Sequence, residues 1–136
     1  MKFSESLKKN RDFQNVYNNG KSYANKYLVM YVLENNTNEN RLGISVSKKV
    51  GNSVVRHRVT RLVRESYRLQ KENFLNGFDI VIIGRIGAKD KSYHEIESAL
   101  LHLGKLHNIM SNSLEMMDWK RYLLDLLNFI ENIFQD

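Results

Sequence analysis

The sequence contains no cysteine, and it has no long run of hydrophobic residues. Without cysteine, disulfides, thiolate metal sites such as zinc knuckles, and cysteine nucleophiles are all excluded. No stretch approaches the roughly 20 apolar residues that a membrane-spanning helix needs. Residues 1–6 also lack the apolar segment of a signal peptide. We therefore expect a cytoplasmic protein without a membrane span, held together by packing alone.

A nucleotide-binding loop and a catalytic constellation are also missing from the sequence. The glycines at positions 43, 51, 84 and 87 form neither a Walker A loop nor a dinucleotide-binding loop. Two of the four histidines could supply an acid–base pair for RNA cleavage, but nothing in their spacing fixes such a pair. His94-Glu95 lacks the second histidine of a zinc-protease helix. We expect no catalytic residue in the chain itself.

What the chain does contain is an uneven excess of basic residues. Of its 136 residues, 42% are hydrophobic and 26% are charged, which fits one compact domain with a core. The net charge is +6, but residues 1–110 hold 19 Lys and Arg against 10 Asp and Glu, whereas residues 111–136 hold two against five. A basic body implies a polyanionic partner, because phosphates neutralised by Lys or Arg release counterions. Nucleic acid is the first candidate and an anionic membrane surface the second.

The hydrophobic pattern of residues 1–110 predicts an α/β fold. Strands are expected at 21–33, 41–47 and 78–84, and helices at about 11–18, 53–75 and 92–108. Because residues 34–40 are polar, strands 21–33 and 41–47 are expected to pair antiparallel as a hairpin. The helix between strands 41–47 and 78–84 suggests that these two strands are parallel.

The segment 48–71 carries the most informative pattern, a basic helix face opposite an apolar stripe. The stripe is Val55, Val59, Leu62, Ser66 and Leu69, and the basic face is His57, Arg61, Arg64, Arg68 and Lys71, with Arg56 and Arg58 beside the stripe. Guanidinium groups bind phosphates through paired hydrogen bonds. A basic face can also be merely solvated. Here, however, acidic neighbours are few, Lys48 and Lys49 precede the helix, and Gly51 permits close backbone approach to a ligand, which together favour polyanion binding.

Three aromatic residues allow two interpretations. Phe13 and Tyr17 are four residues apart and share one face of the first predicted helix, and Tyr31 lies on the following strand. Such spacing is typical of core aromatics. The same rings could form a platform for single-stranded bases, where each stacking contact contributes about 1–3 kcal/mol. From these residues alone, both interpretations stay open.

Residues 111–136 differ in character from the rest, because they predict an acidic amphipathic helix. Its apolar face comprises Trp119, Leu123, Leu126, Leu127, Ile130, Ile133 and Phe134. An apolar face of this kind needs cover. Packing on the body, self-association into a homo-oligomer, and a screen over the basic surface are all open.

Three segments in the same order resemble the bacterial ribonuclease P protein family. They are residues 12–20 (DFQNVYNNG), 42–51 (LGISVSKKVG) and 51–65 (GNSVVRHRVTRLVRE), and the resemblance covers roughly residues 4–108. It implies an α/β two-layer sandwich with a mixed sheet of about four strands and helices packed on it. It also implies a left-handed βαβ crossover, against the usual right-handed rule. Residues 1–110 would form this RNA-binding domain, and 111–136 an additional C-terminal amphipathic helix.

The resemblance also implies a function. In this family a catalytic RNA hydrolyses the phosphodiester with Mg²⁺ that the RNA mainly binds, and no organic cofactor or membrane takes part. The protein binds that RNA and the 5′ leader of precursor tRNA and broadens substrate use. By position, the residues facing the catalytic RNA would be Lys48, Lys49, Arg56, His57, Arg58, Arg61 and Arg68. Those lining the leader cleft would be Phe13, Tyr17, Tyr31, Ser45 and Arg64.

Two positions depart from the family pattern, and other functions compete. His57 stands where the family usually has Asn, and Thr60 where it usually has Lys or Arg, so we expect weaker or more pH-sensitive leader binding. A structural RNA-binding protein of ribosomal type would share the basic helix. A DNA-binding regulator is disfavoured, because a strand and a loop precede the basic helix instead of a short helix and a turn. An autonomous ribonuclease would cleave without added RNA.

Overall fold

The structure is a computed structural model that describes residues 4–133. Its elements in chain order are β1 (Ser4–Ser6), α1 (Asn10–Asn19), β2 (Lys21–Ala24), β3 (Leu28–Glu34), β4 (Asn40–Val46), α2 (Ser53–Gln70), η1 (Lys71–Asn73), β5 (Phe78–Gly84), η2 (Ile86–Ala88), α3 (Tyr93–Leu106) and α4 (Asn112–Ile133). The predicted α/β fold class is confirmed, and each predicted helix is present.

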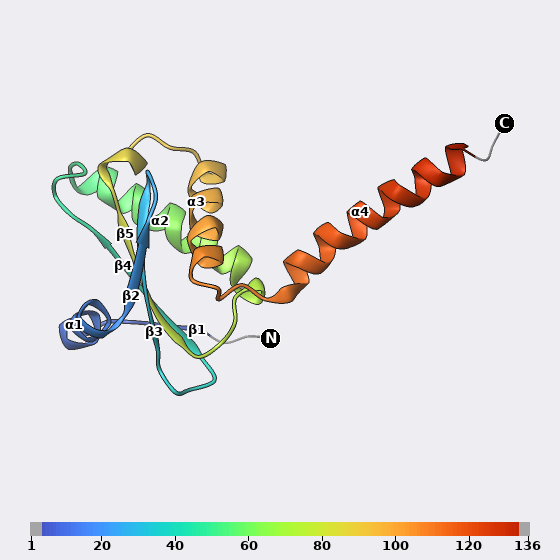
Figure 1. Ribbon diagram of the computed structural model, residues 1–136. Helices are drawn as coiled ribbons and strands as arrows, with labels where there is room; N and C mark the ends of the chain where they lie inside the picture. Colours follow the sequence, from blue (N-terminus) through green and yellow to red (C-terminus); the bar gives the residue numbers. More distant parts are fainter. Residues whose placement is uncertain (1–3, 134–136) are drawn as a thin grey trace.

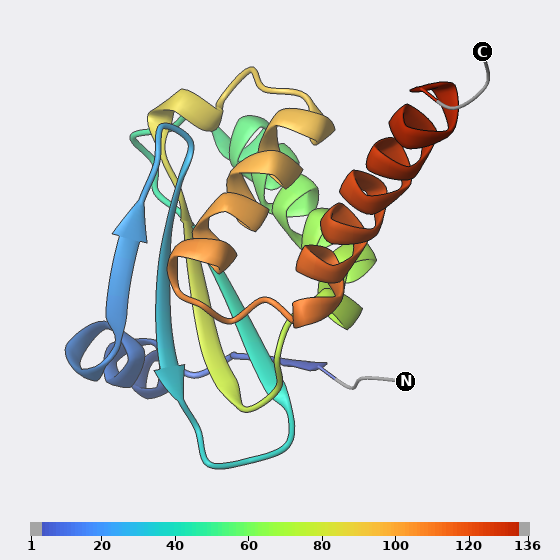
Figure 2. The ribbon, with the colours of Figure 1, turned by 45° about the vertical axis from the view of Figure 1, so that its right-hand side comes forward.

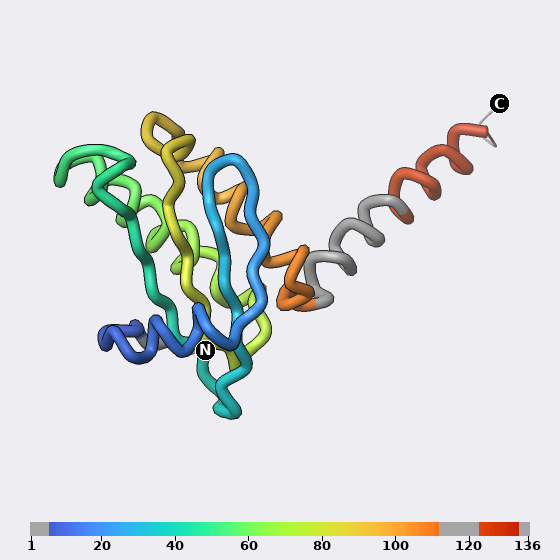
Figure 3. Tube along the Cα trace, turned by 60° about the vertical axis from the view of Figure 1, so that its left-hand side comes forward, coloured from blue at the N-terminus to red at the C-terminus, as the bar shows by residue number. Residues whose placement is uncertain are grey.

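The strands form one mixed sheet in the order β1-β4-β5-β3-β2. Helices α2 and α3 cover one face of this sheet (Figures 1 and 2). Helix α1 lies across the other face, as Figure 3 shows from the opposite side. The short strand β1, which the sequence pattern did not predict, pairs in parallel with β4 at the edge of the sheet.

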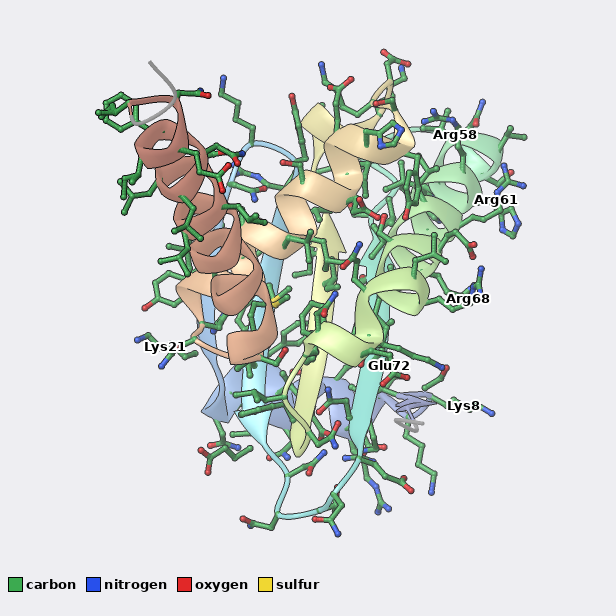
Figure 4. All side chains as sticks on the ribbon, turned by 90° about the vertical axis from the view of Figure 1, so that its right-hand side faces the viewer. Lys8, Lys21, Arg58, Arg61, Arg68 and Glu72 are labelled. Atoms are coloured by element: carbon green, nitrogen blue, oxygen red, sulfur yellow. The ribbon has the colours of Figure 1, made fainter. Side chains whose placement is uncertain are left out.

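The unit β4–α2–β5 has the predicted parallel strands, with Leu42 opposite Ile80 and Ile44 opposite Ile82. In Figure 4, where α2 and α3 stand in front of the sheet, the chain rises along β4, passes through α2 and rises again along β5 to the left of β4. The crossover is therefore left-handed, as the resemblance implies and contrary to the great majority of such units.

Two strand predictions were wrong. Residues 21–33 form two antiparallel strands, β2 and β3, because the Asn25 side chain closes a turn between them by accepting hydrogen bonds from the amides of Tyr27 (3.2 Å) and Leu28 (3.0 Å). Strands β3 and β4 do not pair either. Strand β5 lies between them and pairs with both, because its residues are apolar on both faces and belong at the centre of a sheet.

The core lies mainly between the sheet and the helices α2 and α3. Its largest buried side chains are Leu28, Met30, Phe74, Ile80, Ile82, Ile96, Leu100 and Leu103. The apolar stripe predicted for α2 was partly wrong. Leu69 is 54% exposed, whereas Val63 and Tyr67, which were not assigned to the stripe, are buried beside Val59. A smaller cluster on the α1 side contains Val16 and Val81.

Helix α4 extends away from the rest of the molecule (Figures 1 and 2). Its apolar side chains from Leu123 to Ile133 are exposed. Two members of the predicted apolar face, Trp119 and Phe134, lie outside the side chains that the structure describes. In the described part of the chain, no helix is long and apolar enough to cross a membrane.

Candidate nucleic-acid interface

The loop between β4 and α2 sets the start of the basic helix. Asn52 caps α2, because its side-chain oxygen accepts a hydrogen bond from the Val55 amide at 3.0 Å. A Cβ at Gly51 would lie 2.8 Å from the Val55 Cβ. Gly51 therefore permits a close approach of the loop to the helix itself, and its approach to a ligand stays a prediction. Lys48 and Lys49 remain exposed on the loop.

The basic face of α2 is exposed along the length of the helix. His57, Arg61, Arg64 and Arg68 are all exposed. Figure 4 shows Arg58, Arg61 and Arg68 on the same side of α2, from its second turn to its last. The only acidic residue within the helix is Glu65. The arrangement places a row of cations where a polyanion could reach them from solvent.

Arg56 and Arg58 are only partly exposed. The Arg58 guanidinium donates hydrogen bonds to the backbone carbonyls of Lys89 (Nη1, 3.3 Å) and Lys91 (Nη2, 2.9 Å), which ties α2 to the segment between η2 and α3. The Nε of Arg56 is buried and has no hydrogen-bond partner among the described residues. Arg58 therefore supports the fold as well as presenting charge, and its proposed contact with RNA stays a prediction.

Arg68 is paired with Glu65. Arg68 Nε lies 3.0 Å from Glu65 Oε2, and Arg68 Nη2 lies 2.5 Å from Glu65 Oε1. This hydrogen-bonded pairing raises the pKa of the Arg68 guanidinium and lowers the pKa of the Glu65 carboxyl group. Because both side chains are exposed, the pair contributes little to stability. A phosphate that binds Arg68 would compete with Glu65 for the same donors.

Four of the five residues predicted for the leader cleft meet on the sheet face that α1 covers. The ring centroids of Phe13 and Tyr17 are 6.4 Å apart, and those of Tyr17 and Tyr31 are 5.1 Å apart in an edge-to-face arrangement. Tyr17 also hydrogen-bonds Ser45 on β4, and burial raises the pKa of the Tyr17 hydroxyl. The three rings form an aromatic row that is partly buried and partly open to solvent.

Gly43 positions one end of this aromatic row. A Cβ at Gly43 would lie only 2.6 Å from Cζ of Phe13, so the Phe13 ring rests directly on the glycine backbone. Gly43 pairs with Val81, and Val81 pairs with Tyr31, so the three residues are neighbours across β4, β5 and β3. The sheet surface under the aromatic row therefore leaves room for the Phe13 ring only because position 43 has no side chain.

The fifth residue predicted for the cleft, Arg64, lines a hollow together with Phe13. This hollow has a volume of about 230 Å³, and its lining residues are Ser6, Leu7, Phe13, Leu42, Ile44, Arg64, Tyr67, Arg68 and Lys71. Arg68, which was expected to face only the catalytic RNA, is among them. Lys71, which lies on the basic face predicted for this helix, was assigned neither to the residues facing the RNA nor to those lining the leader cleft. Its spacing of seven from Arg64 was the signal for this place, because residues i, i+4 and i+7 share a helix face.

The site combines ring faces with guanidinium and ammonium groups, and this chemistry suits a phosphodiester chain with unstacked bases. His107, by contrast, lies on another surface, where its Nε2 donates a hydrogen bond to the Met30 carbonyl at 2.8 Å. Among the side chains that the structure describes, no group of three or more His, Asp or Glu residues is placed to hold a metal ion.

Comparisons with known proteins agree with one another. The family model described as Ribonuclease P matches residues 1–107. The ribonuclease P protein component of Lachnoclostridium phytofermentans is 66% identical over 110 residues, which cover 81% of this chain and 95% of that protein. The ribonuclease P protein component of Alkaliphilus oremlandii is 52% identical over 113 residues, which cover 83% of this chain and 99% of that protein.

Solved structures show the same similarity in three dimensions. The RNase P protein of Staphylococcus aureus superposes with a TM-score of 0.72 at 40% identity, covering 78% of this chain and 97% of that chain. The RNase P protein of Thermotoga maritima superposes with a TM-score of 0.69 at 34% identity, covering 74% of this chain and 96% of that chain. The whole of α4 lies beyond the family match.

Proposed function

Because this chain belongs to the ribonuclease P protein family, we propose that it is the protein subunit of a ribonucleoprotein that removes the 5′ leader from precursor tRNA. The catalytic RNA performs the hydrolysis, and the protein binds both that RNA and the leader. We place this activity in the cytoplasm. No residue of the chain is assigned to the chemical step.

The observation that carries this proposal is the position of Phe13. It stands at one end of the aromatic row and also forms a wall of the hollow that carries Arg64 and Arg68. A single strand whose bases stack on Phe13 and Tyr17 would have its phosphates beside these guanidinium groups. Stacking and phosphate neutralisation would then act on the same few nucleotides.

The catalytic RNA would bind along the exposed side of α2. Lys48 and Lys49 on the preceding loop extend this basic face beyond the start of the helix. Neutralising RNA phosphates lowers the repulsion that opposes a compact RNA fold. In this proposal Mg²⁺ is bound mainly by the RNA and supplies the charge stabilisation and activated water of phosphodiester hydrolysis, while the protein reduces the Mg²⁺ concentration that the RNA needs.

The test is cleavage of a precursor tRNA at low Mg²⁺ concentration by a bacterial ribonuclease P RNA, with the protein, without it, and by the protein alone. We expect 5′-leader removal to be stimulated only when RNA and protein are both present. Tight RNA binding without stimulation would instead support a structural RNA-binding protein of ribosomal type. Cleavage by the protein alone would contradict the assignment of the chemistry to the RNA.

A further inference from the structure

The apolar side chains of α4 have no cover within the described part of the molecule. Those from Leu123 to Ile133 are between 38% and 62% exposed. Figures 1 and 2 show the helix projecting from the body, away from the sheet. Most of the stability of a helix in a protein comes from packing its apolar face and not from the helix alone. Helix α4 therefore needs a packing partner.

The spacing of these residues indicates what kind of partner fits. Leu123, Leu126, Ile130 and Ile133 are separated by three, four and three residues, which is the a and d spacing of a heptad repeat. In the sequence the same spacing continues back to Met116 and Trp119. A seam of this spacing packs against another helix with the same repeat, through knobs-into-holes contacts. The described parts of α1, α2 and α3 pack on the sheet and offer no such seam.

We propose that α4 packs against α4 of a second copy of this chain, with the two helices antiparallel. A second copy supplies an identical seam. Leu127 and Phe129 occupy the positions that flank a two-helix seam and widen its apolar contact. An anionic lipid surface is a poorer fit, because residues 111–136 hold five acidic residues against two basic ones.

The charge of the body determines the orientation. Residues 1–110 hold 19 basic against 10 acidic residues, a net charge of +9. Parallel helices would bring two such bodies together at one end of the pair. Antiparallel helices place the bodies at opposite ends of a helix that is about 33 Å long at roughly 1.5 Å per residue, well beyond the Debye length of about 8 Å in physiological salt. The basic face of α2 then stays free on each copy.

This proposal does not rest on the proposed function, because the family match ends at residue 107, before α4 begins. The first experiment measures the molar mass of the full chain by sedimentation equilibrium over a range of concentrations. The double variant Leu123→Asp/Ile130→Asp places two charges in the seam. The matched control, Asn128→Asp/Asn132→Asp, places the same two charges on the polar face of α4.

We expect the wild type and the control to reach the mass of two chains, and the seam variant to dissociate at a concentration at least tenfold higher than the control does. A wild type that stays at the mass of one chain would overturn the proposal. So would a dimer that the seam variant leaves intact. Far-ultraviolet circular dichroism checks that the body remains folded. The precursor tRNA cleavage assay, run on the same samples, tests the proposed function independently of the oligomeric state.

Orientation is tested with one introduced cysteine, which is unique because the chain has none. A spin label at Asn132→Cys lies on the polar face near the end of α4. In an antiparallel pair, Leu123 lies opposite the partner's Leu126, and the two labels are then offset by about 22 Å along the axis. Because the labels face outward on two packed helices, they are also separated by roughly 20 Å across the pair. We therefore expect an interspin distance of about 30 Å. A distance of about 20 Å or less would indicate parallel helices and overturn the proposed arrangement.

Discussion

Arg41 donates two hydrogen bonds to the buried carboxylate of Asp79, from Nε to Oδ1 at 2.8 Å and from Nη2 to Oδ2 at 2.5 Å. The two residues are opposite each other on the parallel strands β4 and β5. Asp79 is only 2% exposed and also accepts a hydrogen bond from Asn35. This pair therefore joins the two strands that carry α2 between them, at their amino ends.

Replacing Arg41 with Met should lower the free energy of unfolding by about 3 kcal/mol, because the buried Asp79 carboxylate loses its charged partner. Urea denaturation followed by circular dichroism measures the change. Arg11→Met is the control, since Arg11 is exposed on α1 and surface substitutions change stability by about 0.5 kcal/mol or less. Equal stabilities for the two variants would show that the Arg41–Asp79 pair is unimportant.

Variants of Arg58 and Arg61, two residues of the same helix, should distinguish an effect on RNA binding from an effect on stability. Arg61 is exposed, whereas Arg58 donates to the carbonyls of Lys89 and Lys91. We expect Arg61→Gln to weaken binding to ribonuclease P RNA and to reduce the slope of log K against log salt by about one, with unchanged stability. Arg58→Gln should also lower the free energy of unfolding by about 1 kcal/mol. Salt titrations of RNA binding and urea denaturation provide the two readouts, and an identical profile for both variants would contradict the distinction.

The aromatic row should matter only for substrates that carry a leader. We expect Tyr17→Leu to weaken binding of precursor tRNA to the assembled ribonucleoprotein by about 5- to 150-fold, since a base–ring contact contributes about 1–3 kcal/mol. Binding of mature tRNA should be unchanged. Tyr17→Phe keeps the ring and loses only the hydroxyl that bonds Ser45, so its effect should be small. Equal losses for leader-bearing and mature tRNA would argue that Tyr17 is only a core residue.

Sequence patterns were sufficient for those helices and strands whose own residues determine their structure. Strand β5 is apolar on both faces, and its central place in the sheet follows from that. The pairing of β3 with β4 could not be excluded locally, because residues 34–40 form a polar connection typical of a hairpin. Strand β5, which comes almost 40 residues later in the chain, pairs with both β3 and β4 and so keeps them apart. The turn at Asn25 depends on one side-chain hydrogen-bond pair, which hydrophobic periodicity does not detect.

The candidate site was predictable in its residue types but not in all its contacts. Spacing and family resemblance both indicated Phe13, Tyr17 and Arg64. They could not indicate that Arg58 binds two backbone carbonyls, because this depends on where the segment after η2 folds. The place of Lys71 in the hollow depends in the same way on how α1 and β1 meet α2.

The departures at His57 and Thr60 predict weaker leader binding than the family pattern would give. His57 is exposed, and the Thr60 hydroxyl donates a hydrogen bond to the Arg56 carbonyl at 2.9 Å and adds no charge. Substituting Asn at 57 and Lys at 60 should strengthen leader binding, because the second change adds a cation that can neutralise a phosphate. Binding of leader-bearing precursor tRNA is the measurement, and unchanged affinity in the double variant would contradict the prediction.

His107 should make the fold sensitive to mild acid. The imidazole is partly buried, donates from Nε2 to the Met30 carbonyl at 2.8 Å, and packs edge-to-face on Tyr23 with ring centroids 4.7 Å apart. Burial lowers the pKa of His107 below its usual value of 6.5, with the nearby Lys21 contributing in the same direction, although the hydrogen bond to Met30 opposes the shift. The folded state therefore favours the neutral imidazole.

Because the unfolded chain binds a proton at His107 more readily than the folded chain does, the free energy of unfolding should fall as the pH drops from about 6.5 through the lower folded-state pKa. His107→Gln keeps a donor for the Met30 carbonyl but does not titrate. Urea midpoints at pH 7.5 and pH 5.5 should therefore differ less in this variant than in the wild type. The comparison uses this difference and not the absolute stability, because the variant also loses the ring contact with Tyr23. His94→Gln, at an exposed position, should retain the wild-type difference, and a loss of that difference in both variants would rule out His107 as its source.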